Sequence, residues 1–296
     1  MFTKLQKKWG IGGWRFFWVM ITFAMTGTTA AFITARITAW LDIEKWSLEF
    51  WLLKLGVLLI GYQILLLFFG FIFGQFRFFW QYEKKILQAV GLIKKDPPLR
   101  LAVFASGKGS NAANLVSYFN HQPSKSKKAK VTLVVCNRPG AGVLELAKKE
   151  GIETLMIEQA GFYSGQYLEQ LRASADALVL AGFLWKIPDD LIKAFPGRII
   201  NIHPALLPKF GGKGMYGHHV HNAVIAGKET KSGISIHAVD EHYDNGDLIF
   251  QATCDVDPGD TAGSLAQKVH ELEMLHYPRQ VEKWLKKVKA SLNTSR

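Results

Sequence analysis

The sequence contains little cysteine. Among its 296 residues only Cys136 and Cys254 are cysteines, and they lie far apart in none of the spacings that hold a metal. This favours a reducing compartment and excludes a disulfide framework, although the two thiols could still form one disulfide. A chain of this length can bury a sizeable core without such cross-links.

The net charge of +12 is unevenly distributed. Residues 1–95 carry twelve Lys or Arg against four Asp or Glu, whereas residues 96–296 carry 24 against 20. The weakly basic second part gives little reason to expect nucleic acid as a partner. The basic excess of the first part therefore needs a different explanation.

Charge is absent from two long apolar runs in the first part. Residues 16–35 and 55–76 contain no charged side chain. Each run can cross a hydrocarbon core of about 30 Å at about 1.5 Å per residue. A cleaved signal peptide fits the first run poorly, because the run is long and a second one follows, and buried core helices are the other alternative. We predict that residues 1–95 form a hairpin of two transmembrane helices and that residues 96–296 form a separate domain.

Basic residues flank the two runs on their outer sides, so the positive-inside rule places both ends of the hairpin in the cytoplasm. Neither run contains an Asp, Glu or His that could relay ions, and the hairpin is therefore interpreted as an anchor. This predicts a protein anchored in the inner (cytoplasmic) membrane, with its second domain in the cytoplasm. The flanking residues are Lys4, Lys7, Lys8 and Arg15 before the first run, and Arg77, Lys84, Lys85, Lys94 and Lys95 after the second.

After residue 98, strand-like and helix-like segments alternate. This alternation predicts an α/β domain with a doubly wound, mostly parallel sheet and crossover helices. Ligands of such folds lie beyond the carboxyl ends of the strands. The expected strands are 100–106, 130–137, 153–157, 177–183 and 198–204, followed by an antiparallel extension over 232–240 and 248–256 and a final helix from about 264 to 285.

Two polar residues stand at the end of the expected strand "RIINIHP". Asn201 and His203 are two apart and therefore point to the same face, and Pro204 then ends the ladder because it has no N–H to donate. Asp244 lies in the acid-rich loop 240–247. These side chains suit acid–base chemistry, although an ordinary hydrogen-bonding histidine and a simple turn are the alternatives.

The segment "SGKGSN", residues 106–111, follows the first expected strand. Its backbone amides could hold a phosphate, but it is neither a dinucleotide fingerprint nor a P-loop. A glycine turn with Ser110 as helix cap is the alternative. The histidines of "YGHHVH" have no Cys or paired acid at ligand spacing, so no metal site is predicted.

Five motifs, taken together and in this order, resemble the phosphoribosylglycinamide formyltransferases, folate-dependent enzymes of purine synthesis. They are "FASGKGSN", "LVLAGFLW", "NIHPALLPKFGG", "HAVDEHYDNGD" and "ELEMLHYP". The resemblance covers about residues 99–288 and leaves residues 1–95 outside. It implies a formyltransferase-like, Rossmann-type fold that transfers a formyl group from the co-substrate 10-formyltetrahydrofolate to the amine of phosphoribosylglycinamide.

The resemblance also implies roles for individual residues. Asn201, His203 and Asp244 match the catalytic Asn, His and Asp of the family, and an ionised Asp244 beside His203 would raise the pKa of that histidine. Gly109, Ser110 and Asn111 match the residues that hold the substrate phosphate and ribose, Glu273 matches the carboxylate at the glycinamide end, and Pro204 and His270 fall at neighbouring positions. The implied folate-binding residues are Leu184, Trp185, Lys186, Ile187, Asn201, Asp240, Glu241, His242, Tyr243 and Asp244.

The sequence departs from the family pattern at the folate site. Trp185 stands where the family often has Arg, and an arginine that meets the folate tail falls at Ser164 or Gly165, for which Lys186 or Arg172 could substitute. A 10-formyltetrahydrofolate hydrolase, a formyltransferase for another amine and a non-catalytic, membrane-anchored folate- or nucleotide-binding module remain alternatives. The sequence gives no indication of the oligomeric state.

Overall fold

The computed structural model describes residues 5–6, 9–41, 44, 47–94, 96–121 and 128–294. The contacts within the chain divide it into two compact units, Met1–Asp96 and Pro97–Arg296. Among the basic residues that flank the apolar runs, Lys4, Lys7, Lys8 and Lys95 lie outside the described residues.

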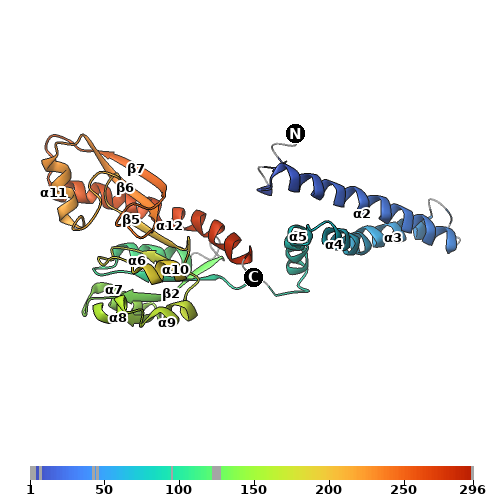
Figure 1. Ribbon diagram of the computed structural model, residues 1–296, viewed down its shortest axis with the longest axis horizontal. Coiled ribbons are helices and arrows are strands. Elements are labelled where there is room, and N and C mark those ends of the chain that lie inside the picture. Colours follow the sequence, from blue (N-terminus) through green and yellow to red (C-terminus); the bar gives the residue numbers. More distant parts are fainter. Residues whose placement is uncertain are drawn as a thin grey trace. The chain divides into compact units, whose positions relative to one another are not determined.

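The first unit is helical (Figure 1). Two of its helical stretches, Gly13–Trp40 and Leu48–Ile72, are long and apolar enough by length and composition to cross a membrane. The elements are α2 (Gly13–Trp40), α3 (Leu48–Gly56), the π-helical turn η1 (Val57–Gly61), α4 (Tyr62–Ile72) and α5 (Phe76–Ala89).

The second apolar stretch differs in its bounds from the run of residues 55–76. It begins at Leu48 and ends at Ile72, because Gly74 takes a positive φ of 67° and its N–H bonds to the carbonyl of Phe71. A new helix, α5, then begins at Phe76. Counting uncharged residues could not detect this break, since a turn built around a glycine carries no charge signal.

The second unit is an α/β domain whose strands are β1 (Leu99–Phe104), β2 (Ala129–Cys136), β3 (Glu153–Met156), β4 (Ala177–Leu180), β5 (Ile199–His203), β6 (Lys231–Ala238) and β7 (Leu248–Asp255). Its helical segments are α6 (Ser110–Val116), η2 (Ser117–His121), α7 (Gly142–Lys149), α8 (Gln159–Tyr163), α9 (Leu168–Ser174), α10 (Asp189–Ala194), α11 (His218–Ala226) and α12 (Ala262–Thr294). The sequence analysis anticipated neither α8 nor α11, and it ended α12 about nine residues early.

The seven strands form one sheet in the order β3-β2-β1-β4-β5-β6-β7. Strands β1 to β5 pair in parallel, whereas β6 and β7 are antiparallel. The predicted doubly wound, mostly parallel sheet with an antiparallel extension is therefore confirmed. The strand order reverses between β1 and β4, which is where ligands bind in such sheets.

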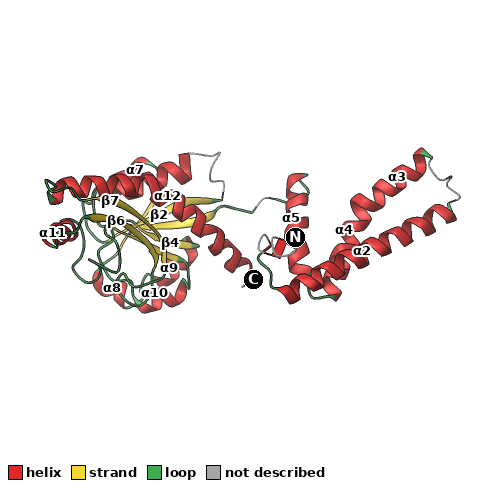
Figure 2. Ribbon diagram, turned by 90° about the horizontal axis from the view of Figure 1, so that it is seen from above, coloured by secondary structure: helices red, strands yellow, loops and turns green. Residues whose placement is uncertain are grey.

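Each face of the sheet is covered by its own group of helices. Leu101 and Val103 of β1 pack with residues of α6, α7 and α12 on one face, whereas Ala102 and Phe104 pack with residues of α8, α9 and α10 on the other. Figure 2 shows α7 and α12 on one side of the strands and α8 and α10 on the other. Because the parallel strands are buried on both faces, their sequences are continuous apolar runs.

Candidate active site

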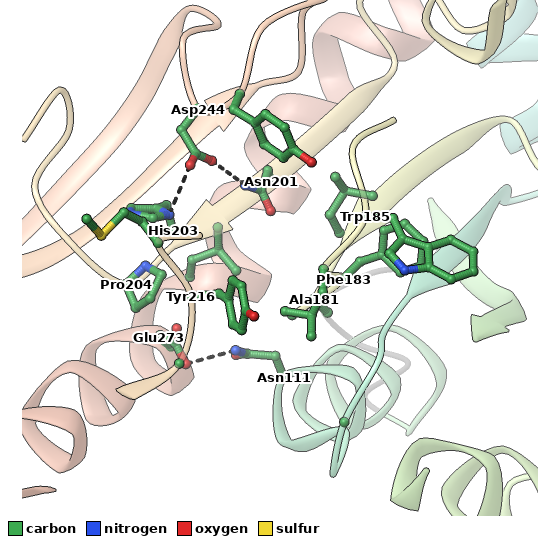
Figure 3. A pocket seen from close by; sticks show the side chains of 18 of the residues that line it. Asn111, Ala181, Phe183, Trp185, Asn201, His203, Pro204, Tyr216, Asp244 and Glu273 are labelled. Carbon is green, nitrogen blue, oxygen red and sulfur yellow. Dashed lines mark hydrogen bonds and ion pairs between the residues drawn. The ribbon is translucent and has the colours of Figure 1, made fainter. Parts of the chain in front are cut away.

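A cavity of about 790 Å³ opens at the carboxyl ends of β1, β4 and β5. The turn after β1, the segment Leu184–Ile187 after β4, the end of β5 and the loop after β6 all line it, as Figure 3 shows from close by. One helix, α12, closes the cavity with His270 and Glu273. Polar side chains from distant parts of the chain therefore share one enclosed space.

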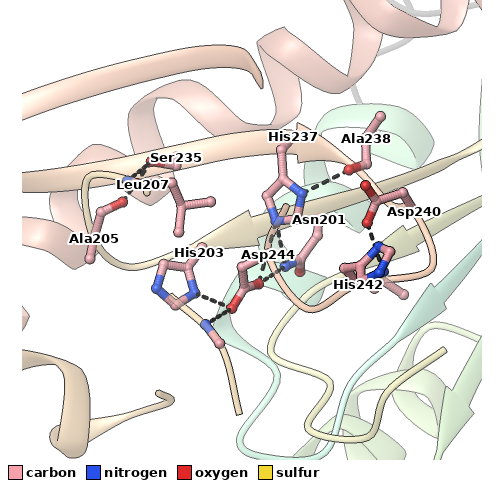
Figure 4. A network of polar contacts seen from close by, with 12 residues as sticks. Asn201, His203, Ala205, Leu207, Ser235, His237, Ala238, Asp240, His242 and Asp244 are labelled. Carbon is pink, nitrogen blue, oxygen red and sulfur yellow. Dashed lines mark hydrogen bonds and ion pairs between the residues drawn. The ribbon is translucent and has the colours of Figure 1, made fainter. Parts of the chain in front are cut away.

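Asn201 and His203 reach this cavity from the same face of β5, as the strand periodicity predicted. Because β6 runs antiparallel beside β5, His237 lies opposite Asn201 and Ser235 lies opposite His203. The amide Nδ2 of Asn201 donates to Nε2 of His237 over 3.0 Å, while Nδ1 of His237 donates to the carbonyl of Ala238 over 2.8 Å (Figure 4). These bonds fix both the imidazole tautomer and the orientation of the Asn201 side chain.

Asp244 comes to the same place from the loop after β6. Its Oδ1 lies 3.4 Å from Nδ2 of Asn201 and 3.5 Å from Nε2 of His237, and its Oδ2 lies 3.6 Å from Nδ1 of His203. The backbone N–H of Gly212 donates to Oδ2 over 2.9 Å. A Cβ at Gly211 would lie only 3.2 Å from the Cβ of Asp244, so a glycine lets the two loops approach this closely.

Burial is the largest influence on the pKa of His203. Desolvation lowers the pKa of this histidine, although Asp244 and the carbonyl of Phe210 both act to raise it. Asp244 acts in the direction expected from the sequence, but burial outweighs it because His203 is only 4% exposed. Nε2 of His203 donates to the carbonyl of Phe210 over 2.8 Å, which leaves Nδ1 facing Asp244.

Asp244 is held in its charged form. Burial acts to raise the pKa of its carboxyl group, but the neighbouring imidazoles of His237 and His203 and the N–H of Gly212 outweigh burial and lower it. The cavity therefore contains a carboxylate next to a histidine whose proton affinity is reduced by its surroundings. Such a pair is suited to moving a proton near neutral pH.

A second polar group faces Asp244 across the cavity. Asn111 donates from Nδ2 to Oε2 of Glu273 over 2.8 Å, and Nδ1 of His270 lies 3.2 Å from the same oxygen. Among the described residues, Oδ1 of Asn111 is buried without a hydrogen-bond partner. A buried acceptor with no partner is costly, so this atom suits a ligand that donates a hydrogen bond.

Asn114 of α6 donates a hydrogen bond to a carbonyl of α12 that a proline leaves without a helical partner. Pro278 lies inside α12 and has no N–H, so the carbonyl of Met274 has no partner within the helix. Nδ2 of Asn114 donates to that carbonyl over 2.8 Å. One turn of α6 carries both Asn111 and Asn114, and each therefore contacts α12 beside the cavity.

The structure brings almost all of the residues singled out in the sequence to this one cavity. Glu241 does not line it and is exposed. Those that do line it are Gly109–Asn111, Leu184–Ile187, Asn201, His203, Pro204, Asp240, His242–Asp244, His270 and Glu273.

Sequence reasoning missed His237, Tyr216 and His221, which also line the cavity. His237 had a signal, because Ser235 and His237 alternate with isoleucines in "ISIHA" just as Asn201 and His203 do in β5. His221 lies on α11 and is buried, and its Nδ1 has no partner among the described residues. In the described part of the chain, no three His, Cys, Asp or Glu side chains gather in an arrangement that could hold a metal.

Residues 99–281, more than half of the chain, match the model of the formyl transferase family. The chain belongs to this family. Residues 12–94 match a different model, that of a family of unknown function. The boundary between the two matches coincides with the boundary between the two units of the fold.

The formyl transferase part of the chain has named relatives. It is 42% identical over 191 residues to the chloroplastic phosphoribosylglycinamide formyltransferase of Vigna unguiculata. The aligned residues cover 62% of this chain and 60% of the relative. It is 35% identical over 192 residues to the phosphoribosylglycinamide formyltransferase of Bacillus subtilis, which is 63% of this chain and 94% of that protein. The chain thus spans less than two thirds of the plant relative but almost all of the bacterial one.

Solved structures give the same result. The phosphoribosylglycinamide formyltransferase from Bacillus halodurans superposes with a TM-score of 0.56 at 32% identity, over 63% of this chain and 95% of that one. The enzyme of that name from Streptococcus pneumoniae gives 0.55 at 32% identity, over 63% and 99%. Both matches fit the size of the second unit, Pro97–Arg296.

The chain differs from the expected pattern at the wall formed by residues after β4. Trp185 packs against Phe162 and Phe183, with ring centroids 6.0 Å apart in each pair. Lys186 lines the cavity and pairs with Asp189 over 3.6 Å. Ser164, Gly165 and Arg172 do not line the cavity, and Arg172 pairs with Glu169 over 3.1 Å. An aromatic wall thus stands where an arginine was expected.

Proposed function

We propose that this protein transfers a formyl group from 10-formyltetrahydrofolate to the amine of phosphoribosylglycinamide, a step of purine synthesis. The observation that carries the proposal is the position of Asp244, which lies 3.4 Å from Asn201 and 3.6 Å from His203 on the wall of a single cavity. The names of its bacterial and plant relatives supply the substrates.

The size and polarity of the cavity suit two substrates that meet inside it. At about 790 Å³ it falls in the range of small-molecule sites, roughly 300–1,000 Å³. Its two polar corners lie at opposite ends of Figure 3, with Asp244 and His203 at one and Asn111 and Glu273 at the other. The second corner would hold the ribosyl phosphate substrate, with Oδ1 of Asn111 accepting from a hydroxyl group. The folate would lie against Leu184–Ile187 and Asp240–Asp244.

The chemistry requires a hydrogen-bond donor for the formyl oxygen and a proton acceptor for the attacking amine. The amine nitrogen attacks that carbon, which creates a tetrahedral intermediate with an oxyanion and a surplus proton on nitrogen. Nδ2 of Asn201 lies 3.4 Å from Asp244, a long contact, so this hydrogen is available to the oxyanion. Asp244 accepts the amine proton directly or through water, and Nδ1 of His203, which faces Asp244, takes that proton on. Collapse of the intermediate expels the folate nitrogen, which takes up a proton.

The test is formyl transfer by the purified full chain in detergent, with phosphoribosylglycinamide as acceptor. Turnover that depends on the acceptor and falls at least about a hundredfold in His203→Ala supports the proposal. The matched control is His121→Ala, which removes an exposed histidine that pairs with Glu150 away from the cavity. Folate cleavage without acceptor would indicate a hydrolase, and binding without either reaction would indicate a non-catalytic module.

We further propose that the first unit anchors the enzyme in the inner membrane through α2 and the stretch α3–α4, with the catalytic domain in the cytoplasm. Large apolar side chains on these helices face outward, for example Phe71 at 74% and Ile60 at 67% exposure. In water such surfaces would be unfavourable, whereas lipid accepts them. Alkaline carbonate treatment of membranes checks this, because an integral protein stays in the pellet. Release of the full chain into the supernatant would exclude the anchor.

A further inference from the structure

Helix α5, which directly follows the second candidate span, has two contrasting sides. Only three residues separate its first residue, Phe76, from Ile72 at the end of α4. At about 100° per residue, Phe79, Ile86 and Val90 fall on one side of the helix axis, and Arg77, Gln81 and Lys84 fall on the other. The helix is therefore amphipathic.

The first half of the apolar side is docked on the other helices of the unit. Phe79 is 1% exposed and meets Phe23 of α2 edge to face at 5.1 Å. A Cβ at Gly70 of α4 would lie 2.9 Å from the ring of Phe79, so a glycine permits the close approach. Phe78 packs on Trp9 with ring centroids 5.5 Å apart. These contacts fix the rotation of α5 about its own axis.

The second half of the same apolar side is uncovered. Tyr82, Ile86 and Val90 continue it and stay 42%, 48% and 65% exposed, although Phe78 and the Lys85 amine of the same helix contact the ring of Tyr82. Phe76 and Trp80 stack at the edge of this side, with ring centroids 6.1 Å apart, and each is more than a third exposed. An aromatic pair beside an apolar stripe is typical of the boundary between lipid tails and headgroups.

The rest of the α5 surface is basic, with Lys85 flanking the apolar side and its amine 5.5 Å from the Tyr82 ring. Arg77 and Lys85 are exposed, and Lys84 is half-buried and pairs with Asp96 over 2.5 Å. The acidic residue of this helix, Glu83, lies on the docked side, and burial raises the pKa of its carboxyl group. The outward-facing charge of α5 is therefore positive.

Helix α5 runs in a different direction from the two candidate spans. Figures 1 and 2 both show it turned across the direction of α2 and α4 within the first unit. If α2 and α4 cross a membrane, a helix that lies across them runs along the membrane surface. Its uncovered apolar stripe then faces the lipid tails, and its basic side faces the headgroups.

We propose that α5 is an interfacial helix that binds anionic phospholipids, with Tyr82, Ile86 and Val90 in the outer part of the hydrocarbon and Arg77 and Lys85 on the headgroup phosphates. The binding rests on the proposed membrane anchor and adds to it a preference for anionic lipid. On the cytoplasmic leaflet, which carries anionic lipid, each nearby basic residue strengthens the attachment. The occupant of the uncovered stripe is thus the bilayer itself.

The test compares two single cysteines in the full chain reconstituted into vesicles. Cys254→Ser removes the more accessible native thiol, while buried Cys136 is kept. Ile86→Cys then reports the apolar side, and Gln81→Cys is the matched position on the exposed polar side. The rate of reaction with a membrane-impermeant maleimide is normalised to the labelling reached after detergent opens the vesicles.

In vesicles containing phosphatidylglycerol, we expect the cysteine at position 86 to react at least about tenfold more slowly than the one at position 81. Phosphatidylcholine alone should reduce this protection, and so should high salt, because it screens the headgroup charge. Arg77→Gln with Lys85→Gln should remove the dependence on anionic lipid. Lys286→Gln with Lys287→Gln, which removes two exposed charges from α12 in the other unit, should leave it unchanged.

Two results would overturn the proposal. One is equal reactivity of the two cysteines, which is expected if both sides of the helix are in contact with water. The other is protection at position 86 that depends on protein density and not on lipid charge, which would assign the stripe to a second copy of the chain. Carbonate extraction of the same samples tests the membrane anchor separately from the interfacial helix. If the chain stays in the membrane pellet while the two cysteines react equally, the interfacial helix is excluded and the anchor is not.

Discussion

The two units of this protein differ in the side chains that they expose and in the polar groups that they bury. In the first unit Thr22 and Thr26 are fully buried, while Phe71 and Ile60 are exposed. In the second unit the sheet buries aliphatic residues, and the buried side chains of Asn111, His203, His221 and His237 line one cavity. The first pattern suits a lipid surrounding and the second suits water.

The units also differ in how they satisfy buried polar groups. Thr22, Thr26 and Thr34 each donate a hydrogen bond to the carbonyl four residues earlier in their own helix, over 2.7–2.8 Å. In the second unit the buried groups bond across the fold, as Asn201 does with His237, which lies 36 residues away. Helices that satisfy themselves can enter lipid one at a time, whereas a network between distant strands exists only after the domain has folded.

The largest expected effect breaks the network of the second unit. Asp244→Asn removes the negative charge that accepts the amine proton, and we expect turnover to fall about 10²–10³-fold. The fold should survive, because Asn tolerates the positive φ of 51° at this position. Stopped-time formyl-transfer assays together with thermal melts measure both effects. Asp247→Asn, in the same loop but outside the cavity, is the control and should retain full turnover.

The next effect tests whether His237 acts through Asn201. His237→Phe removes the acceptor that orients the Asn201 amide, and we expect kcat to fall about 10–100-fold with a smaller change in KM. In an Asn201→Ala background the same substitution should cost little more, since the side chain it positions is already gone. Steady-state kinetics of the two single variants and the double variant decide this. Losses that multiply would show that His237 acts independently.

A third variant disturbs the first unit alone. Gly70→Ala would place a methyl group 2.9 Å from the ring of Phe79, and we expect overpacking to destabilise the first unit by about 1–3 kcal/mol. Turnover should not change. Protease resistance of the detergent-solubilised chain reports the first unit separately from activity. Gly27→Ala is the control, because a methyl group there meets no atom within 4 Å.

The smallest expected effect is a difference between the two units in how their stability depends on pH. All nine histidines follow residue 96, and burial lowers the pKa of His203, His221 and His276. A histidine whose folded pKa is lowered stabilises the fold fully above its unfolded pKa of about 6.5 and loses that contribution as pH falls toward the folded value. The melting temperature of the second unit should therefore fall as pH is lowered below about 6.5.

Calorimetry over this pH range measures the effect on the second unit. His221→Asn should flatten the dependence, because it removes a buried imidazole whose pKa burial lowers. The first unit has no histidine and serves as the internal reference. A parallel fall in the stability of both units would contradict the assignment to histidine.

Much of the second unit was predictable because its rules are local. Alternating apolar and helical segments gave the parallel sheet, and period two in "NIHP" placed Asn201 and His203 on one face. What escaped depends on partners distant in the sequence. His237 becomes a partner of Asn201 only once β6 pairs with β5, and α11 has a glycine-rich entry with little apolar periodicity to announce it.

The first unit illustrates the opposite limit. Its two apolar runs were visible from the absence of charge, but the turn at Gly74 and the separate helix α5 were not. The net effect of burial on His203 was missed for a related reason. A sequence names the charged neighbour Asp244, but the extent of desolvation depends on what else surrounds the imidazole ring.

In the segment of α12 from Glu273 to Pro278, the number of residues matters more for the position of the helix than their identity. The proline leaves the carbonyl of Met274 without a helical partner, and that carbonyl accepts a hydrogen bond from Asn114. The preceding residue, Glu273, accepts one from Asn111. The hydroxyl of Tyr277 donates to the carbonyl of Leu180, at the end of β4, over 2.6 Å. Each added or deleted residue turns a helix by about 100°. An insertion before Glu273 can be taken up at the start of the helix, whereas one between Glu273 and Tyr277 would rotate one attachment point away while the other stayed in place. The spacing of these few residues therefore sets the rotational register of the whole helix against the cavity.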